Sequence, residues 1–353
     1  MCLEIKEQMR IGIVTQPLCV NYGGILQNYA LQRVLKRLGH KPITLDYLPS
    51  LSFGRYLLYV CKGLLCFFIP GKRHPIKPYS HYARRPSTID SFVRDNIILT
   101  KTIPSYSKRM LKKYGIETMI LGSDQVWRYS YNSHYIEDMY FSFAQKFPCK
   151  KIVYGASFGV DKWDYPEAIT IEAKELIKQF DAISVRENSA VLLCNEIFGI
   201  EAQVVLDPTM LLEASEYEKF FVTLDTNKPY IAAYVLDKND EKEAFIKALA
   251  KENGLGVIEM TVSDNGNTVE EWLSTIKNAE YVITDSYHGC LFSILFQKQF
   301  KLFINKERGA DRFNTILGRL GIKDGYIDYD KVTDRLNEFR EQSIRFLFDN
   351  LKQ

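Results

Sequence analysis

The chain has 353 residues, 46% of them hydrophobic and 25% charged, which is an ordinary globular composition at a length that favours two domains over one. Seven scattered cysteines argue against a disulfide framework and show no zinc-ligand spacing. The N-terminal MCLEIKEQMR lacks the layout of a signal peptide. We therefore expect a reduced, cytoplasmic setting. The net charge of +3 is unevenly spread, because residues 51–113 hold thirteen Lys or Arg and two acids, a net +11 that leaves −8 elsewhere.

Residues 10–46 predict a βαβ unit. A β-branched run at 11–15 predicts a strand, and the apolar side chains from Ile25 to Leu38 fall at helical spacing. A second parallel strand is expected at 41–46. The glycine-containing loop QPLCVNYGG then lies at the carboxyl end of the first strand.

The basic segment begins with LSFGRYLLYVCKGLLCFFIPGK, an apolar run interrupted by Arg55 and Lys62. A spanning helix needs about 18 uninterrupted apolar residues, and this run falls short. Residues 51–73, ending in Lys72 and Arg73, suit a segment lying in an anionic membrane interface at the inner face of the membrane. The alternative is an ordinary insertion, buried along its apolar part and solvated along its basic part.

Strands and helices then alternate through the rest of the chain. In the first half we expect strands at 117–121, 151–157, 181–185 and 203–206, with helices at 171–180 and 189–198. A polar, helix-like stretch at 213–228 precedes strands at 230–236, 256–260, 281–284 and 300–304 and helices at 240–252, 268–278, 289–296 and 331–352. This order predicts an α/β protein of two Rossmann-like domains facing across a cleft, 1–225 with the insertion at about 50–113, and 226–353 with a long C-terminal helix.

The first candidate loop contains Asn21, Tyr22, Gly23 and Gly24, between the first strand and the first helix. Glycines there let the backbone approach a ligand, and the helix N-terminus offers free N–H groups to an anion. The loop is not GxGxxG, which makes a nicotinamide cofactor an unsuitable interpretation. The alternative is that the glycines only form a tight turn.

The second candidate loop is GSDQVW, which places Ser123, Asp124, Gln125 and Trp127 directly after a strand. A planar apolar face beside side chains that bond hydroxyl groups suits a carbohydrate site. Trp127 suits a position in the core equally well.

ISVREN places Arg186 where a buried strand ends, and a planar guanidinium suits bidentate capture of a carboxylate or phosphate. The alternative is a salt bridge to Glu187 or another neighbour. Arg308 and Arg312 follow the last strand of the second domain and would share a rim with His288.

In VITDSYHGC, a strand ends and one of only five histidines follows. Asp285 and Ser286 can turn the chain and cap the next helix, and Gly289 would let that helix start close to a ligand. His288 is thereby carried to the rim of the cleft. A core histidine satisfied by Asp285 is the alternative.

The motifs YGGILQNYALQ, LGSDQVW, ISVREN, VVLDPT and VITDSYHG, in this order from about residue 11 to 320, resemble the polysaccharide pyruvyl transferase family. The resemblance implies a two-domain fold like that of GT-B glycosyltransferases. It also implies transfer of the enolpyruvyl unit of phosphoenolpyruvate to sugar hydroxyls of an exopolysaccharide or capsule precursor, usually as a cyclic ketal, with release of phosphate.

The resemblance assigns His288 as the catalytic histidine and Arg186 as a catalytic, donor-binding arginine. Some family members carry an arginine where this chain has Ser286, so Arg308 or Arg312 would supply the missing donor charge, with Ser286 and Gly289 at the same helix start. The expected acceptor contacts are Asn21, Tyr22, Gly23, Gly24, Asn28, Ser123, Asp124, Gln125 and Trp127.

Phosphoenolpyruvate carries a phosphate and a carboxylate, and ketal formation needs a proton at its methylene carbon and a base for the sugar hydroxyl. Histidine exchanges protons in both directions near neutral pH, and arginines with a helix N-terminus can hold both anions. We expect a lipid- or nucleotide-linked sugar acceptor, no metal, no cofactor and no nucleic-acid partner. The competing interpretations are a GT-B glycosyltransferase using a nucleotide sugar and a degenerate sugar- or anion-binding protein.

Overall fold

The first of two parallel sheets has six strands in the order β2-β1-β3-β4-β5-β6. The computed structural model describes residues 8–19, 21–48, 60, 85–226, 228–261, 263, 265–305, 309–323 and 325–352. The strands of the first sheet are β1 (Arg10–Val14), β2 (Lys41–Thr44), β3 (Thr118–Leu121), β4 (Lys150–Ala156), β5 (Ala182–Val185) and β6 (Gln203–Val204). Every residue of β3 is buried, as expected of a central parallel strand covered on both faces.

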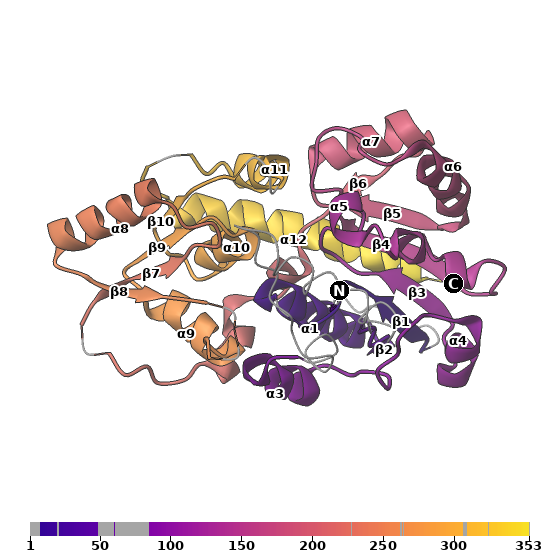
Figure 1. Ribbon diagram of the computed structural model, residues 1–353, viewed down its shortest axis with the longest axis horizontal. Helices are drawn as coiled ribbons and strands as arrows, with labels where there is room; N and C mark the ends of the chain where they lie inside the picture. The colour runs from indigo at the N-terminus through magenta and orange to yellow at the C-terminus, as the bar shows by residue number, and fades with distance from the viewer. Residues whose placement is uncertain are drawn as a thin grey trace.

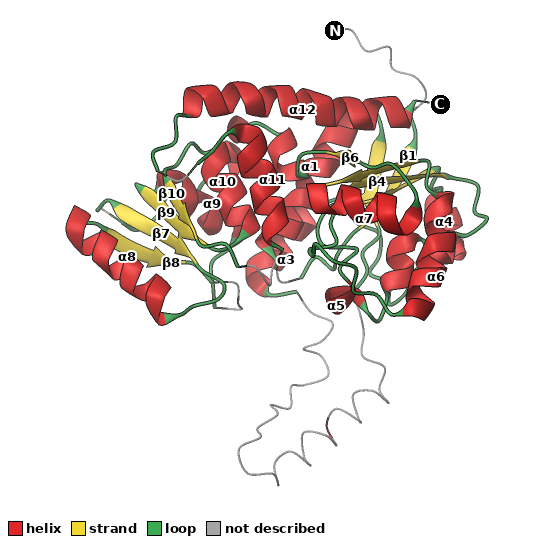
Figure 2. Ribbon diagram, turned by 90° about the horizontal axis from the view of Figure 1, so that it is seen from above, coloured by secondary structure: helices red, strands yellow, loops and turns green. Residues whose placement is uncertain are grey.

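The second sheet has four parallel strands in the order β10-β9-β7-β8. Its strands are β7 (Tyr230–Tyr234), β8 (Gly256–Glu259), β9 (Tyr281–Thr284) and β10 (Phe300–Leu302). The two sheets lie in separate halves of the molecule (Figures 1 and 2). The predicted α/β class with two Rossmann-like, GT-B-like halves and a C-terminal helix is therefore confirmed.

Helices connect successive strands in both halves. The α-helices are α1 (Tyr22–Arg37), α3 (Ser87–Asn96), α4 (Lys108–Tyr114), α5 (Tyr129–Asn132), α6 (Glu167–Leu176), α7 (Asn188–Phe198), α8 (Asp240–Asn253), α9 (Val269–Asn278), α10 (Tyr287–Leu295), α11 (Ala310–Leu320) and α12 (Tyr329–Leu351). Short 3-10 turns are η2 (Ile136–Tyr140), η3 (Ser142–Ala144), η4 (Ile177–Gln179), η5 (Pro208–Leu211) and η6 (Ala214–Phe220).

Helix α12 belongs to both halves of the molecule. It begins against the second half, where the Tyr329 hydroxyl donates to the Ser293 carbonyl at 3.4 Å. It then runs across to the first half (Figure 2), where Ser343 Oγ accepts from Leu206 N at 2.9 Å and the Phe346 ring lies 6.2 Å from that of Tyr154. A single helix thus ties the two sheets together.

Several boundaries differ from the sequence prediction. Helix α1 begins at Tyr22 rather than Ile25 because Asn21 is its N-cap, and its side chain accepts from Gly23 N at 3.0 Å. The predicted helix at 171–180 begins earlier, just after Pro166, and the described residues of the helix-like stretch at 213–228 form the 3-10 turn η6 rather than an α-helix. Helices α3, α4, α5 and α11 were not predicted.

The predicted domain boundary at residue 225 falls between β6 and β7 and stays a prediction. The apolar and basic start of the insertion, residues 51–73, lies outside the described residues apart from Val60. Within the described part of the chain, no helix combines the length and the apolar character that crossing a bilayer requires.

Candidate active site

A cleft of about 650 Å³ separates the two halves at the carboxyl ends of their strands. The first half contributes Asn21, Asp124 and Gln125 to its walls, and the second half contributes Ser286, Tyr287, His288 and Arg312. Ligand sites in open α/β sheets lie at this edge. The cleft therefore joins six of the predicted site residues, from loops that lie far apart in the sequence, with Tyr287, which the prediction did not name.

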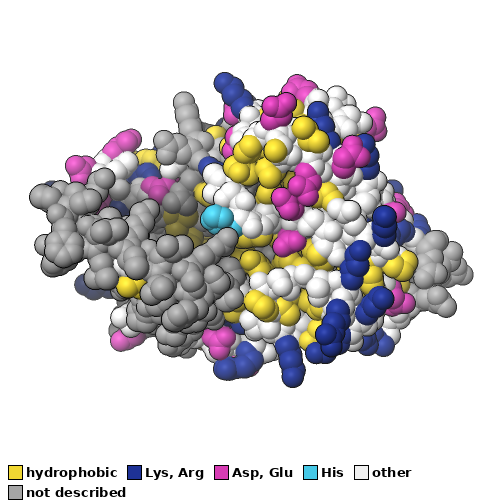
Figure 3. All heavy atoms as spheres, turned by 45° about the vertical axis from the view of Figure 1, so that its right-hand side comes forward, with side chains coloured by type: hydrophobic (Ala, Val, Ile, Leu, Met, Phe, Trp, Pro, Cys, Tyr) yellow, Lys and Arg dark blue, Asp and Glu magenta, His cyan; other side chains and the backbone are white. Residues whose placement is uncertain are grey.

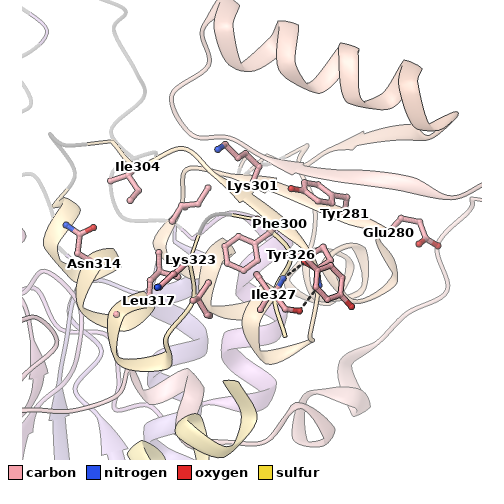
Figure 4. A pocket seen from close by; sticks show the side chains of 15 residues that line it. Glu280, Tyr281, Phe300, Lys301, Ile304, Asn314, Leu317, Lys323, Tyr326 and Ile327 are labelled. Carbon is pink, nitrogen blue, oxygen red and sulfur yellow. Dashed lines mark hydrogen bonds between the residues drawn. The ribbon is translucent and has the colours of Figure 1, made fainter. Parts of the chain in front are cut away.

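A larger cavity, about 800 Å³, lies in the second half beside the edge strand β10 (Figure 4). Its lining combines apolar side chains, such as Phe300, Leu317 and Ile322, with polar ones, and its charged members are Glu280, Lys301 and Lys323. The described lining residues include no histidine or arginine. Proton transfer and anion binding therefore point to the smaller cleft.

His288 lies in the first turn of α10, which therefore begins before the predicted residue 289. Ser286 is the N-cap, and its Oγ accepts from Gly289 N at 3.4 Å. A Cβ on Gly289 would lie 2.3 Å from Thr284 Oγ1, so this glycine serves the packing of α10 on β9 rather than the approach of a ligand.

Asp285 is not the partner of His288. Its carboxylate accepts from the backbone N–H groups of Leu236 and Asp237 at 2.7 and 3.0 Å and from Lys242 Nζ at 2.7 Å. These bonds fix the loop after β7. The alternative of a core histidine satisfied by Asp285 is therefore wrong.

The acid facing His288 is instead Asp207, which follows β6 in the first half. His288 Nε2 lies 3.6 Å from Asp207 Oδ2, an ion-pair distance that is too long for a hydrogen bond. On its other side the imidazole lies against the first turn of α1, where a Cβ on Gly23 would be 1.9 Å from Nδ1. Gly23 is therefore required by the close approach of the two halves rather than by a turn.

Arg186 is fully buried and holds two carboxylates of the first half together. Its guanidinium donates to Asp207 Oδ2 at 2.9 Å and to Asp124 Oδ1 at 3.2 Å. Burial opposes the charge, yet the two carboxylates hold the pKa of Arg186 above its usual value. Arg186 thus forms its salt bridges with Asp124 and Asp207 rather than with Glu187. It lies behind the cleft wall rather than on it.

Arg312, on α11, does line the cleft. Both Arg312 and Arg186 lie against the Tyr287 ring, with their guanidinium carbons 4.9 and 5.1 Å from the ring centroid. Burial, together with the charge of Arg186, lowers the pKa of Arg312 to about 10, so it stays cationic at neutral pH. Arg308 lies outside the described residues.

Among the predicted acceptor residues, Asn21, Asp124 and Gln125 lie on the cleft wall. Asn21 Nδ2 donates to Asp124 Oδ2 at 3.1 Å, and Asp124 has a φ of 102°, a left-handed backbone that is rare for a residue with a side chain. Gly24 lies next to them, since a Cβ there would be 3.4 Å from Asn21. Ser123, just behind, donates to the Gly155 carbonyl at 2.9 Å.

Three other predicted acceptor residues lie in the core. Trp127 is fully buried, stacks on Tyr140 at 5.3 Å and donates to the Met139 carbonyl at 3.1 Å. Asn28 accepts from Thr44 Oγ1 at 2.7 Å, and the Tyr22 hydroxyl donates to the Thr261 carbonyl at 3.0 Å. None of the three lines the cleft, so Trp127 is the core anchor of the alternative interpretation.

Two residues that the prediction did not assign complete the site. Asp207 stood in the motif VVLDPT directly after a strand, which is itself the signal for a side chain at the carboxyl edge. Gln27 is buried on the inner face of α1 and donates through Nε2 to Asp207. The sequence signal for Gln27 was a polar residue on an otherwise apolar helix face, one turn after Gly23 and Gly24. Among the described residues, no group of His, Cys, Asp and Glu is suited to hold a metal ion.

The sequence matches the family model described as polysaccharide pyruvyl transferase over residues 21–306. No curated protein matches it in sequence. Similar solved structures include a UDP-N-acetylglucosamine 2-epimerase from Rickettsia bellii, at 11% identity and a TM-score of 0.46, with 97% of each chain covered. A glycosyltransferase from Rickettsia africae has 11% identity and a TM-score of 0.43, with 98% of this chain and 95% of that chain covered.

Proposed function

Because the chain belongs to the polysaccharide pyruvyl transferase family, we propose that it transfers the enolpyruvyl unit of phosphoenolpyruvate to hydroxyl groups of a sugar acceptor, forming a ketal and releasing phosphate. The observation that carries this proposal is the position of His288 on the cleft wall, with Asp207 behind it and Arg312 beside it. A proton-exchanging group and an anion-binding group thus share one solvent-accessible cavity.

The donor brings two anionic groups, and the cleft offers cationic and dipolar partners for them. Arg312 supplies a charge that persists at neutral pH. The N-termini of α1 and α10 meet at the contact between Gly23 and His288, and helix N-termini favour bound anions. Arg186 supports this arrangement from behind, through its pairs with Asp124 and Asp207, and Arg308 stays a further candidate.

The acceptor sugar would lie against the first half of the molecule. Asn21, Asp124 and Gln125 offer amide and carboxylate groups that can bond hydroxyls. The acceptor site of this proposal therefore leaves out Trp127 and Asn28, which the core holds.

The reaction balances with one histidine as the proton carrier. His288 delivers a proton to the methylene carbon of the donor, which makes C2 electrophilic, and takes the proton of the first sugar hydroxyl as its oxygen bonds to C2. The C2–O bond to phosphate breaks, a second hydroxyl bonds to C2, and its proton leaves with the phosphate. No metal or cofactor is required for these steps.

The acceptor would be lipid- or nucleotide-linked, at the cytoplasmic face of a membrane. The exposed cations of α4, which are Lys108, Arg109, Lys112 and Lys113, support contact with an anionic surface. Figure 3 shows Lys and Arg side chains gathered on the lower part of one face of the molecule. Flotation with anionic liposomes should recover the protein, and replacing these four residues with Ser should reduce the recovery; equal recovery with neutral liposomes would contradict the contact.

The direct test of the function is incubation with phosphoenolpyruvate and a panel of lipid- and nucleotide-linked sugars. We expect phosphate release matched by an acceptor mass gain of one pyruvate less one water. Glycosyl transfer from a nucleotide sugar, with no turnover of phosphoenolpyruvate, would replace this proposal with a glycosyltransferase.

A further inference from the structure

The carboxylate of Asp207 is the most heavily bonded acid in the site. Its side chain is fully buried at the end of the first sheet. Oδ1 accepts from both the backbone N–H and the hydroxyl of Thr209, at 3.0 and 2.7 Å. These two bonds fix the plane of the carboxylate and direct Oδ2 toward the boundary between the two halves.

Three nitrogens from separate elements surround Oδ2, two of them as hydrogen-bond donors and the third at ion-pair distance. Gln27 Nε2 reaches it from α1, Arg186 Nη1 reaches it from the end of β5 at 2.9 Å, and His288 Nε2 lies 3.6 Å away on α10. Burial alone would raise the pKa of Asp207, but His288 and Arg186 hold it well below its usual range. The acid is therefore ionised throughout the neutral range.

The His288 ring is otherwise held by shape. Tyr287 packs edge-on against it at 5.6 Å, and the first turn of α1 packs so closely on the ring that a Cβ at residue 23 would lie 1.9, 2.0 and 2.3 Å from Nδ1, Cγ and Cε1. Nε2 has no hydrogen-bond partner among the described residues. The acid within ion-pair distance of it is Asp207.

We propose that Asp207 is the positioning residue of His288, holding Nε2 toward the first half so that Nδ1 exchanges the proton with substrate. The inference rests on the proposed function and deepens it. The carboxylate also balances the charge that the imidazole gains on taking the hydroxyl proton, because an ion pair in a buried site is screened little by solvent. Since acid and histidine come from different halves, the catalytic pair is complete only when the halves are closed together.

A double-mutant cycle on kcat tests the coupling between the two residues. Asp207→Asn should lower kcat by no more than the loss in His288→Ala, roughly 10²–10⁴-fold for a general acid–base group, while the KM for phosphoenolpyruvate stays near the wild-type value. In the His288→Ala background, Asp207→Asn should change kcat by less than about threefold, because a residue that acts through another has no separate effect. Multiplicative losses in kcat would overturn the proposal.

Asp46 provides the matched control. It is a buried acid of the first half that also pairs with an arginine, Arg85, and accepts from a threonine, Thr102 Oγ1, at 2.7 Å. Asp46→Asn should lower the stability in a comparable way and leave kcat unchanged. A fall in kcat equal to that of Asp207→Asn would show that loss of a buried acid acts only through stability.

A second readout does not depend on activity, so failure of the proposed function can be told apart from failure of this inference. With five histidines in the chain, the imidazole ¹⁵N signals of His288 can be identified by their loss in His288→Ala. Its Nε2 signal should shift in Asp207→Asn and not in Asp46→Asn; an unshifted signal overturns the proposal. If Asp207→Asn does not fold, Thr209→Val, which removes only the hydroxyl bond to Oδ1, should still lower kcat selectively, and an unchanged kcat would count against the inference.

Discussion

Gly23→Ala perturbs the active site through a single methyl group. The new Cβ would lie 1.9 Å from Nδ1 and 2.0 Å from Cγ of His288, so the ring must shift by about 1.5 Å to reach ordinary contact at 3.4 Å. A misplacement of about 1 Å at a reacting group costs roughly 10²-fold in rate. We therefore expect kcat for pyruvyl transfer to fall by roughly 10²-fold.

The loss of stability has a limit of its own, set by helix propensity and packing. Alanine in a helix is favoured over glycine by about 1 kcal/mol, while overpacking costs roughly 1–3 kcal/mol, so the free energy of unfolding should fall by at most about 2 kcal/mol. Urea unfolding and steady-state kinetics measure the two effects separately. Gly318→Ala in α11 is the control, because a Cβ there meets no atom within 4 Å and brings only the helix gain. If Gly23→Ala keeps kcat within about twofold of the wild type, His288 is not the reacting group in the position described.

Four further outcomes follow from the same contacts. Arg186→Ala should lower the free energy of unfolding by about 3–5 kcal/mol in urea, because it removes the guanidinium that Asp124 and Asp207 share. A stable variant with only weakened donor binding would restore its predicted role as a direct donor clamp. Arg312→Ala should weaken donor binding by roughly 2–4 kcal/mol in calorimetry with little rescue by Arg312→Lys, and an unchanged affinity would place the donor elsewhere. Trp127→Ala should cost about 3–5 kcal/mol of stability, whereas a raised acceptor KM in a fully stable variant would show sugar contact. The pKa of Asp207 is depressed in the folded protein, so its ionised carboxylate stabilises the fold above the unfolded pKa of about 3.9, and this stabilisation is lost as the pH falls below that value. The free energy of unfolding of Asp207→Asn should therefore fall less steeply from pH 4 to pH 2 than that of the wild type. Parallel curves would contradict this linkage.

The alternation of strands and helices predicted the fold, because parallel strands with helical crossovers leave a strong periodic signal along the chain. The same signal predicted which loops would meet, since the carboxyl ends of parallel strands share one edge. Asn21, Asp124 and His288 are brought together for that reason. Helix starts were less predictable: glycines at 23 and 24 indicated a loop, although they form the first turn of α1.

The detailed geometry of the site depends on side-chain contacts between distant parts of the chain, which a single sequence does not reveal. Trp127 followed a strand just as a ligand-binding aromatic would, and only the packing against Tyr140 distinguishes the two roles. Arg186 had the right chemistry for an anionic donor, but its partners, Asp124 and Asp207, lie far from it in the sequence and neutralise it. Pairings between distant loops are set by tertiary packing, so they became visible only in the structure.

Helix α12 bears on how the molecule unfolds. Its first turns pack on the second half, while Arg340 Nε donates to the Met210 carbonyl at 2.8 Å and Phe346 packs on the first half. A chain cut at residue 225 would leave the first half without this covering helix, with the apolar surface under Phe346 and Leu347 open to water. The halves therefore share one folding unit, and denaturant should unfold them in a single cooperative transition whose m-value reflects the surface of both.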